Sequence, residues 1–134
     1  MKTMGQKRAH YALNKIINLI QDNGNKDLRK DFKSLVNSAP SIILKNGFGQ
    51  ALAFWYSKGT DKDLKIKEND KHIILLRLIM NWLNERKFTH AKDEKAFLKE
   101  LFDMDQSKYL ASQSEVLKFL EWVKRFANTD IGGN

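Results

Sequence analysis

The sequence has no cysteine and only one proline among its 134 residues. Without cysteine, the chain can form no disulfide, no thiolate nucleophile and no zinc or iron–sulfur site that depends on cysteine ligands. The absence agrees with a cytoplasmic location, because proteins of that compartment have no need of disulfides. The scarcity of proline leaves long helices possible, because proline is the residue that interrupts them most strongly.

Long apolar runs are absent as well. The longest apolar-rich stretch covers residues 73–80 and is interrupted by Arg77, whereas a membrane-spanning helix needs about 20 mainly apolar residues. The first eight residues carry charge, but no apolar segment follows them as it would in a secretory signal. We therefore expect no membrane span and no signal peptide, and we expect the protein in the cytoplasm.

Acidic residues are scarce in the first part of the chain. Residues 1–37 contain eight basic and three acidic side chains, whereas residues 92–134 contain seven basic and eight acidic ones. The net charge of the whole chain is +8. Positive charge that is clustered in this way is typical of a surface that binds nucleic acid or another acidic partner. A surface that is simply rich in lysine throughout remains the alternative.

The chain does have a strong helical pattern. Apolar residues make up 42% of the sequence, and they recur at intervals of three and four residues. We predict an all-α fold, a compact bundle of about six to seven helices that forms one domain over residues 1–134. Its ordered core is expected over about residues 4–128, with a flexible tail over 129–134. The predicted helices cover residues 4–22, 26–37, 38–46, 48–57, 70–87 and 92–104, and a last one follows Ser112.

Several helix ends carry sequence signals. Pro40 is expected in the first turn of a short helix, where a proline lacks no needed donor. Asp70 is the predicted N-cap of helix 70–87, and the pattern Ser112-x-x-Glu115 predicts a capping box at the start of the last helix. Helix 70–87 is apolar around nearly its whole circumference, so we expect it at the centre of the bundle.

No group of residues in the sequence has the spacing of a catalytic or metal site. His72 and His90 are separated by roughly 27 Å along a helix, too far for both to act on one phosphate. The acidic loop that starts at Asp61 resembles a calcium loop only superficially, because Ile66 and His72 replace the glycine and the glutamate that such a loop requires. We therefore predict no catalytic residue, no metal and no cofactor.

Basic side chains form a stripe on each of the first two predicted helices, opposite the apolar face. Asp22 is the only acidic residue on either stripe. A stripe of one charge that includes an aromatic side chain can hold phosphates and stack on a base. The ordinary polar face of an amphipathic helix is the alternative. The first stripe contains Lys7, Arg8, Tyr11, Asn14, Lys15 and Asn18, and the second contains Lys26, Arg29, Lys30 and Lys33.

Three further aromatic residues suit either the core or a contact with a partner. Trp55 and Tyr56 belong to helix 48–57, which is apolar around most of its circumference, and Trp122 lies at the border of the apolar arc of the last helix. Core packing is the favoured interpretation for all three. A patch that contacts another protein is the alternative.

Three segments of the chain, residues 6–12, 40–54 and 120–127, resemble the small α-helical subunit of the type III-B CRISPR (Cmr, RAMP-module) effector complex. The length, the basic charge, the absence of cysteine and the order of helices agree with that family. Residues 58–104 are of the same helical type as the corresponding part of that family, but they contain no motif that matches it. The matching motifs are Gln6-x-Arg8-Ala9-x-x-Ala12, Pro40-x-Ile42-Ile43-Leu44-Lys45-Asn46-Gly47-Phe48-Gly49-Gln50-Ala51-Leu52-Ala53-Phe54 and Leu120-x-Trp122-x-Lys124-Arg125-Phe126-Ala127.

The resemblance implies a non-catalytic subunit of a crRNA ribonucleoprotein that silences RNA in antiviral defence. Several copies would stack in a filament along the backbone of the complex, beside the subunits that hold the crRNA. They would help to bind the target single-stranded RNA that other subunits cut. The implied partners are therefore other Cmr subunits, further copies of the chain, crRNA and target RNA. Arg8, Lys45, Lys124 and Arg125 lie in the matching motifs and become candidate RNA or interface residues.

Two alternatives to this function remain open from the sequence. One is a basic helical adaptor that binds an acidic protein and does not act on RNA. The other is a small metal-independent ribonuclease that uses His10. The candidate subunit contacts are Tyr11, Trp55, Tyr56 and Trp122. The candidate RNA contacts are Lys7, Arg8, Lys15, Lys26, Arg29, Lys30, Lys33, Lys45, Lys124 and Arg125.

Overall fold

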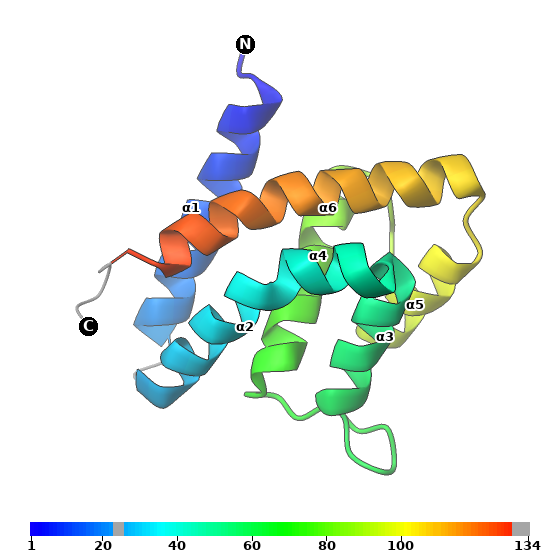
Figure 1. The fold of residues 1–134 in the computed structure, drawn as a ribbon, viewed down its shortest axis with the longest axis horizontal. Helices are drawn as coiled ribbons and strands as arrows, with labels where there is room; N and C mark the ends of the chain where they lie inside the picture. The colour runs from blue at the N-terminus through cyan, green and yellow to red at the C-terminus, as the bar shows by residue number, and fades with distance from the viewer. Residues whose placement is uncertain (23–25, 130–134) are drawn as a thin grey trace.

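The computed structural model describes residues 1–22 and 26–129, and it describes the side chains of all these residues except 20–22. In this part of the chain the only extended pairing is an isolated antiparallel bridge between Thr60 and Ile66. The predicted all-α fold is therefore confirmed. The helices, labelled in Figure 1, are α1 (Met4–Asp22), α2 (Lys26–Asn46), α3 (Phe48–Lys58), α4 (Lys71–Glu85), α5 (Glu94–Phe102) and α6 (Gln106–Ala127).

The long helix α6 organises one side of the bundle. α1 crosses α6, and α2 packs beside it (Figure 1). α4 packs against α2 and α3, and α5 closes the bundle against α3 and α4. The N-terminus projects past α6, and the connection between α3 and α4 forms a loop on the opposite side of the molecule (Figure 1). The start of α1 and the start of α2 therefore lie on different sides of α6.

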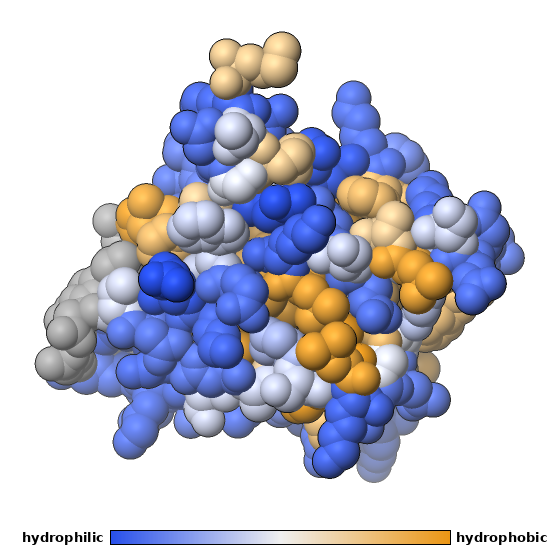
Figure 2. Space-filling model, turned by 45° about the horizontal axis from the view of Figure 1, so that its top comes forward, coloured by the Kyte–Doolittle hydropathy of each residue, from blue (hydrophilic) through white to orange (hydrophobic). Residues whose placement is uncertain are grey.

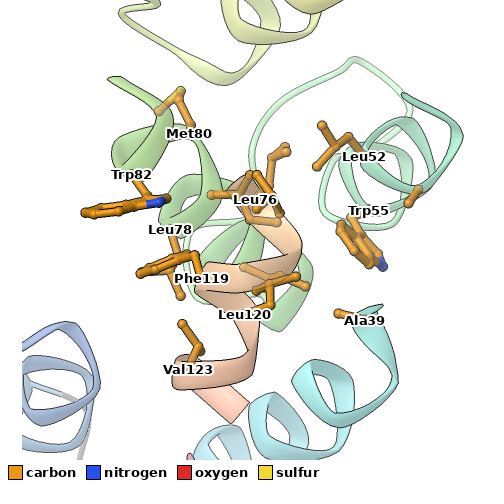
Figure 3. Packing of buried hydrophobic residues seen from close by; sticks show 14 of the residues in the cluster. Ala39, Leu52, Trp55, Leu76, Leu78, Met80, Trp82, Phe119, Leu120 and Val123 are labelled. Atoms are coloured by element: carbon orange, nitrogen blue, oxygen red, sulfur yellow. The ribbon is translucent and has the colours of Figure 1, made fainter. Parts of the chain in front are cut away.

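The core forms where α3, α4 and α6 meet (Figure 3). Trp82 of α4 stacks on Phe119 of α6 with ring centroids 4.9 Å apart, and Trp55 of α3 is wholly buried. Burial of one large apolar side chain stabilises a fold by roughly 1.5–3 kcal/mol. Eight of the 15 residues of α4 are buried, so the prediction of a central helix in this segment is confirmed.

Pro40 does not begin a new helix. The predicted helices over 26–37 and 38–46 are one helix, α2, with Pro40 in its interior, so this prediction is wrong. A proline inside a helix costs roughly 3 kcal/mol, because it removes one backbone hydrogen bond and its ring crowds the preceding turn. The apolar stripe nevertheless continues through this point, since Ala39, Pro40 and Ile43 are all buried. Burial on both sides of the proline outweighs the lost bond.

The last helix begins earlier than the Ser-x-x-Glu pattern predicts. Its first residue is Gln106, and its N-cap is Asp105, whose side chain accepts a hydrogen bond from the backbone amide of Lys108 at 2.8 Å. Ser112 is buried inside the helix, where its hydroxyl donates to the carbonyl of Lys108 at 2.9 Å. Glu115 forms an ion pair with a residue of α1 instead of reaching back to a helix start. The capping-box prediction is therefore wrong, and the pattern marks a contact between helices.

The N-caps of α4 and α5 are formed by aspartate side chains. Asp70 accepts a hydrogen bond from the backbone amide of His72 at 2.7 Å, which confirms the predicted cap. α4 then ends at Glu85, two residues before the end that the sequence predicts. α5 is shorter than predicted, because Asp93 caps it by accepting from the amide of Ala96 at 2.8 Å.

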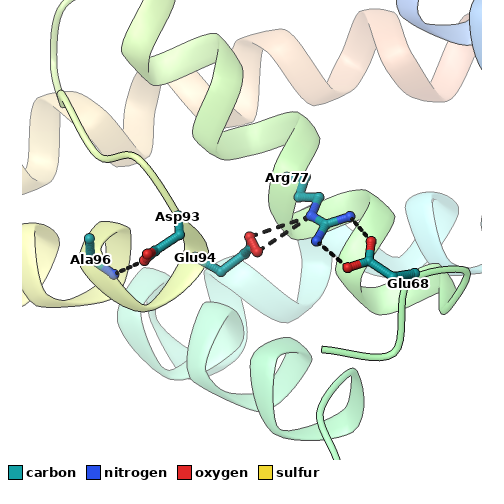
Figure 4. A network of polar contacts seen from close by, with 5 residues as sticks. All are labelled: Glu68, Arg77, Asp93, Glu94 and Ala96. Carbon is teal, nitrogen blue, oxygen red and sulfur yellow. Dashed lines mark hydrogen bonds and ion pairs between the residues drawn. The ribbon is translucent and has the colours of Figure 1, made fainter. Parts of the chain in front are cut away.

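A charged network ties the loop before α4 and the start of α5 to the middle of α4 (Figure 4). Arg77 donates through Nη1 to Glu68 at 2.7 Å and through Nε to Glu94 at 3.4 Å. The side chain of Glu94 is 7% exposed, whereas that of Glu68 is 70% exposed. Because an unpaired buried carboxylate is strongly destabilising, the longer contact with Glu94 matters more for stability than the shorter contact with Glu68.

None of the described helices is both long and apolar enough to cross a membrane. Residues 130–134, which make up most of the predicted flexible tail, lie outside the described part of the chain. The prediction for that tail therefore stays a prediction.

Candidate functional site

The basic stripe predicted on α2 is largely exposed. Lys26, Lys30 and Lys33 are exposed on consecutive turns of the helix, and none of them forms an ion pair with a described residue. Arg29 is half-buried, and its Nε has no hydrogen-bond partner among the described residues. The side chain of Asp22, the acid predicted on these stripes, is not among those that the structure describes. The exposed lysines give the first half of α2 a positive face.

The C-terminal end of α6 lies beside this face. The side chains of Asn37 and Asn128 exchange hydrogen bonds at 2.6 and 3.3 Å. Lys33 lies one turn before Asn37 on α2. Lys124 likewise lies four residues before Asn128, so each lysine is about 6 Å along its helix axis from this bridge. Because α2 and α6 run antiparallel (Figure 1), the two lysines lie on opposite sides of the bridge. We call Lys26, Lys30, Lys33, Lys124 and Arg125 the α2–α6 basic patch.

Two other candidate RNA residues lie away from this patch. Lys45 is in the last turn of α2, roughly 18 Å along the helix axis from Lys33, the nearest residue of the patch on that helix. Lys7 is exposed in the first turn of α1, and the start of α1 projects past α6 (Figure 1). Cations in the last turn of a helix also stabilise the helix dipole, which is a sufficient structural reason for Lys45. The candidate RNA residues therefore do not share one face.

Arg8 is engaged inside the fold. Its Nε and Nη2 donate to the two carboxylate oxygens of Glu115 at 2.6 and 2.9 Å. The two side chains are only 14% and 8% exposed. A two-pronged pair of this kind is stronger than a single neutral hydrogen bond. The pair joins α1 to α6 and gives Arg8 a structural role, while its contact with RNA stays a prediction.

Glu115 is also bound by α4. Trp82 donates from its indole Nε1 to the same carboxylate at 3.0 Å. Burial alone would raise the pKa of Glu115, but the hydrogen bonds from Arg8 and Trp82, together with the charge of Arg86, outweigh burial and hold that pKa below its usual value. Glu115 therefore stays ionised at neutral pH and fixes α1, α4 and α6 to one another.

Tyr11 and Lys15 pack beside this ion pair. The ring of Tyr11 lies against Trp82 with centroids 4.9 Å apart. The ammonium of Lys15 lies 5.1 Å from the centre of the Tyr11 ring, a cation–π contact. These neighbours cover part of the aromatic surface that the sequence offers for stacking on a base, and they give both residues a role in packing.

The predicted subunit contacts differ in exposure. Trp55 is 0% exposed and is therefore a core residue, which is the interpretation that the sequence favoured. A side chain buried in this way has no surface for a partner to contact. Tyr56 and Trp122 are half-buried, and Trp122 stacks on Phe126 with centroids 6.1 Å apart. Both retain some surface that a partner can contact.

Four of the exposed large apolar side chains lie on helices, and the sequence analysis did not single them out. Figure 2 shows apolar surface gathered in the middle of one face, with polar surface around it. Exposed apolar surface of this kind is typical of protein–protein contacts. A helical pattern by itself does not separate such residues from core residues, because both continue an apolar stripe. The exposed fractions are 69% for Leu44, 49% for Phe54, 58% for Phe102 and 50% for Leu110.

The acidic loop and His72 are held in local structure. Asp61 accepts hydrogen bonds from the backbone amides of Asp63 and Lys65 at 2.8 and 3.0 Å. His72 lies with its Nδ1 2.9 Å from the N-cap carboxylate of Asp70. Within the described ranges, no three acidic or histidine side chains come together in a way that would hold a metal ion.

A cleft of about 290 Å³ opens between the start of α1 and the end of α4. Lys7 lies on its α1 side and Arg86 on its α4 side. The sequence analysis did not single out Arg86, because it follows the last turn of a mainly apolar helix and lies far along the chain from the basic stripes. Lys7 belongs to this cleft and not to the α2–α6 basic patch.

Comparison with known proteins gives the family. Residues 4–130 match the family model described as CRISPR-associated protein (Cas_Cmr5). The fold also matches the crystal structure of a CRISPR-associated Cmr5 family protein from Thermus thermophilus, with a TM-score of 0.71 and 25% sequence identity. That match covers 94% of this chain and 96% of the Thermus chain. The chain therefore belongs to the Cmr5 family of CRISPR-associated proteins, the family of the small helical subunit that its sequence motifs resemble.

Proposed function

We propose that this chain is a non-catalytic small subunit of a type III-B CRISPR ribonucleoprotein, in which it helps to bind target single-stranded RNA for cleavage by other subunits. Membership of the Cmr5 family makes it a subunit of a Cmr complex, with the other Cmr subunits as partners. The observation that carries the RNA contact is the α2–α6 basic patch, which lies on two helices that pack together.

The α2–α6 basic patch has the chemistry that an RNA backbone requires. Its five cations form no ion pair with a described residue, so phosphates can bind without breaking a pair inside the fold. Ammonium and guanidinium groups that contact phosphates read charge and not base sequence. Binding that is independent of sequence suits a subunit of a complex in which the crRNA selects the target.

The arrangement of the histidines supports a subunit that does not cut RNA. His72 lies at the start of α4 beside the carboxylate of Asp70, and His90 follows the far end of the same helix. His10 is exposed near the start of α1. Cleavage of target RNA by the complex should therefore be unaltered by His10→Ala. Loss of cleavage in this variant, with binding of target RNA retained, would instead favour the ribonuclease alternative.

The exposed apolar side chains support contacts with other subunits. Leu44, Phe54, Phe102 and Leu110 each expose about half or more of their surface, and burial of such surface drives association. We propose that these residues, with Tyr56 and Trp122, meet neighbouring subunits, including further copies of this chain in a filament within a cytoplasmic complex. An adaptor that binds only an acidic protein is the alternative. The adaptor would be favoured if two results held together. The chain would still capture its protein partners after RNase treatment, and the complex would show no affinity for RNA.

The central test reverses charge on the α2–α6 basic patch in the assembled complex. The double variant Lys30→Glu, Lys33→Glu should weaken binding of target RNA by about tenfold or more, because two phosphate contacts become repulsive. The matched control is Lys62→Glu, Lys65→Glu, the same change of charge in the exposed loop between α3 and α4. Circular dichroism establishes that both variants keep their helices. Equal RNA binding by the two double variants would contradict the proposed role of the patch.

A further inference from the structure

The cleft between α1 and α4 is lined in the same way by both helices. Each helix contributes three residues at the spacing i, i+3, i+4, which places them on one side of that helix. The volume of about 290 Å³ is at the small end of the range of about 300–1,000 Å³ that ligand sites occupy, so the cleft suits one nucleotide better than a larger ligand. The α1 side consists of Lys7, His10 and Tyr11, and the α4 side consists of Trp82, Glu85 and Arg86.

The cations of this cleft form no ion pair with a described residue, although the charge of Arg86 also acts on Glu115. Lys2 also lines the cleft, and neither it nor Lys7 or Arg86 forms an ion pair with a described residue. The Nε of Arg86 has no hydrogen-bond partner among the described residues. The nearby carboxylate of Glu115 is already neutralised within the fold. Three cations therefore face the single carboxylate of Glu85, and the cleft favours an anion.

The aromatic wall of the cleft is rigid. Tyr11 packs on Trp82 with ring centroids 4.9 Å apart, and Trp82 stacks on Phe119 at 4.9 Å with an angle of 14° between the rings. A wall that is held in place reduces the entropy lost when a ligand binds. Burial and the charge of Glu85 raise the pKa of Tyr11, so its hydroxyl stays protonated and can donate a hydrogen bond.

The position of Glu85 indicates what kind of anion fits. Glu85 is an exposed carboxylate that forms no ion pair with a described residue, so it can accept a hydrogen bond from a ligand that carries a donor beside its phosphate. A ribonucleotide offers such a hydroxyl donor close to its phosphate. Acidic side chains recognise ribose in this way in dinucleotide-binding proteins, and the 2′-hydroxyl is the group that distinguishes RNA from DNA.

We propose that the α1–α4 cleft binds one ribonucleotide, with its phosphate held by Lys2, Lys7 and Arg86 and its ribose 2′-hydroxyl donating a hydrogen bond to Glu85. The inference rests on the proposed function, because the ribonucleotide is taken to be part of a target RNA strand. It adds to that function a second RNA contact, separate from the α2–α6 basic patch. This second contact distinguishes RNA from DNA. A free nucleoside monophosphate offers the same chemistry, so the test includes one.

The first arm of the test compares single-stranded RNA and DNA of the same sequence, with binding to the full chain measured by fluorescence anisotropy. We expect the unmodified chain to prefer RNA by about tenfold, the effect of one hydrogen bond to a charged group. Glu85→Ala should bring the ratio of the two affinities close to one. Asp63→Ala, which removes another exposed acid, should leave the ratio unchanged. No preference for RNA in the unmodified chain, or a preference that survives Glu85→Ala, would overturn the proposal.

The second arm tests the phosphate contact with adenosine 5′-monophosphate in isothermal titration calorimetry. We expect saturable binding that Arg86→Gln weakens about tenfold and that Lys65→Gln leaves unchanged. Lys7→Gln serves as a second variant if Arg86→Gln does not fold, because Lys7 is exposed. Absence of binding, or binding that neither cleft variant weakens, would overturn the phosphate assignment. Mononucleotide binding that an RNA strand does not displace would overturn the assignment to a strand.

The two proposals fail in different ways. If Lys30→Glu, Lys33→Glu weakens RNA binding while Glu85→Ala and Arg86→Gln change nothing, the cleft is not a ribonucleotide site and the proposed function stands. If that charge reversal has no effect while Arg86→Gln weakens mononucleotide binding, the role of the α2–α6 basic patch fails and the cleft stands.

Discussion

At the scale of single residues, the position of α1 depends chiefly on Glu115. Its carboxylate accepts two hydrogen bonds from Arg8 and one from Trp82 in a site where it is 8% exposed. The folded pKa of Glu115 is lowered. The stabilisation that the ionised Glu115 contributes to the fold is therefore fully present above the unfolded pKa, and it is lost as the pH falls through the folded pKa.

Glu115→Gln should lower the free energy of unfolding near neutral pH by roughly 2–3 kcal/mol, because Arg8 loses its charged partner in a partly buried site. The difference from the unmodified chain should begin to shrink as the pH falls below about 4.3, the ordinary pKa of glutamate. It should be lost as the pH falls through the lower folded pKa of Glu115, where the native carboxyl becomes protonated. Urea unfolding over this range of pH measures the difference. A difference that stays constant down to acid pH would contradict the assigned ion pair.

Two buried tryptophans provide a matched comparison. Trp82 donates to Glu115, whereas the Nε1 of Trp55 has no hydrogen-bond partner among the described residues. Both changes to phenylalanine remove a similar volume, but Trp82→Phe also removes a hydrogen bond to a charged group. We expect Trp82→Phe to destabilise the chain by about 1–2 kcal/mol more than Trp55→Phe. Equal midpoints in urea unfolding would show that the indole–carboxylate bond contributes nothing.

Sequence patterns do not reveal this centre. Arg8 and Glu115 are 107 positions apart, and on a helical projection Arg8 looks the same as its neighbour Lys7. The ordinary Ser-x-x-Glu pattern even assigns Glu115 to a helix start. Only the crossing of α1 over α6 separates the two cations, because it buries Arg8 and leaves Lys7 exposed.

At the scale of elements, local patterns predicted a helix correctly where the signal for its end and the packing of its apolar face indicate the same boundary. The predicted segment 4–22 is α1, and Asp70 caps α4 as expected. The two errors arose where a local signal competed with long-range packing. Pro40 suggested a break that the buried stripe of α2 overrides, and Ser112 suggested a cap six residues after the true start of α6 at Gln106.

The contact of α4 with α5 can be tested through Arg77. Arg77→Gln leaves the buried Glu94 without its counter-charge, so the free energy of unfolding should fall by about 1–2 kcal/mol, less than for a fully buried pair because Arg77 is 33% exposed. Glu68→Gln should cost less than Arg77→Gln, because that carboxylate is largely in solvent and its pair is screened by water. A greater loss of stability from Glu68→Gln than from Arg77→Gln in urea unfolding would reverse the assigned importance of the two contacts.

At the scale of the whole molecule, positive charge is concentrated in two separate places, the α2–α6 basic patch and the α1–α4 cleft. The sequence predicted the excess of positive charge and the exposed lysines of α2, because both follow from composition and helical periodicity. It did not predict that the end of α6 lies beside α2, where Asn128 bonds Asn37, or that Arg86 and Lys7 line one cleft. Those neighbours depend on how α6 and α4 cross the other helices, and no local pattern encodes a crossing.

The measurement that tests the RNA-binding role most directly is the dependence of RNA affinity on salt. For five phosphate contacts at the α2–α6 basic patch, the logarithm of the affinity for single-stranded RNA should fall with the logarithm of salt concentration with a slope of about −3.5. In Lys30→Glu, Lys33→Glu the slope should be shallower by about 1.4, while Lys62→Glu, Lys65→Glu should keep the original slope. An affinity that does not fall between low and moderate salt would contradict the electrostatic role proposed for this subunit.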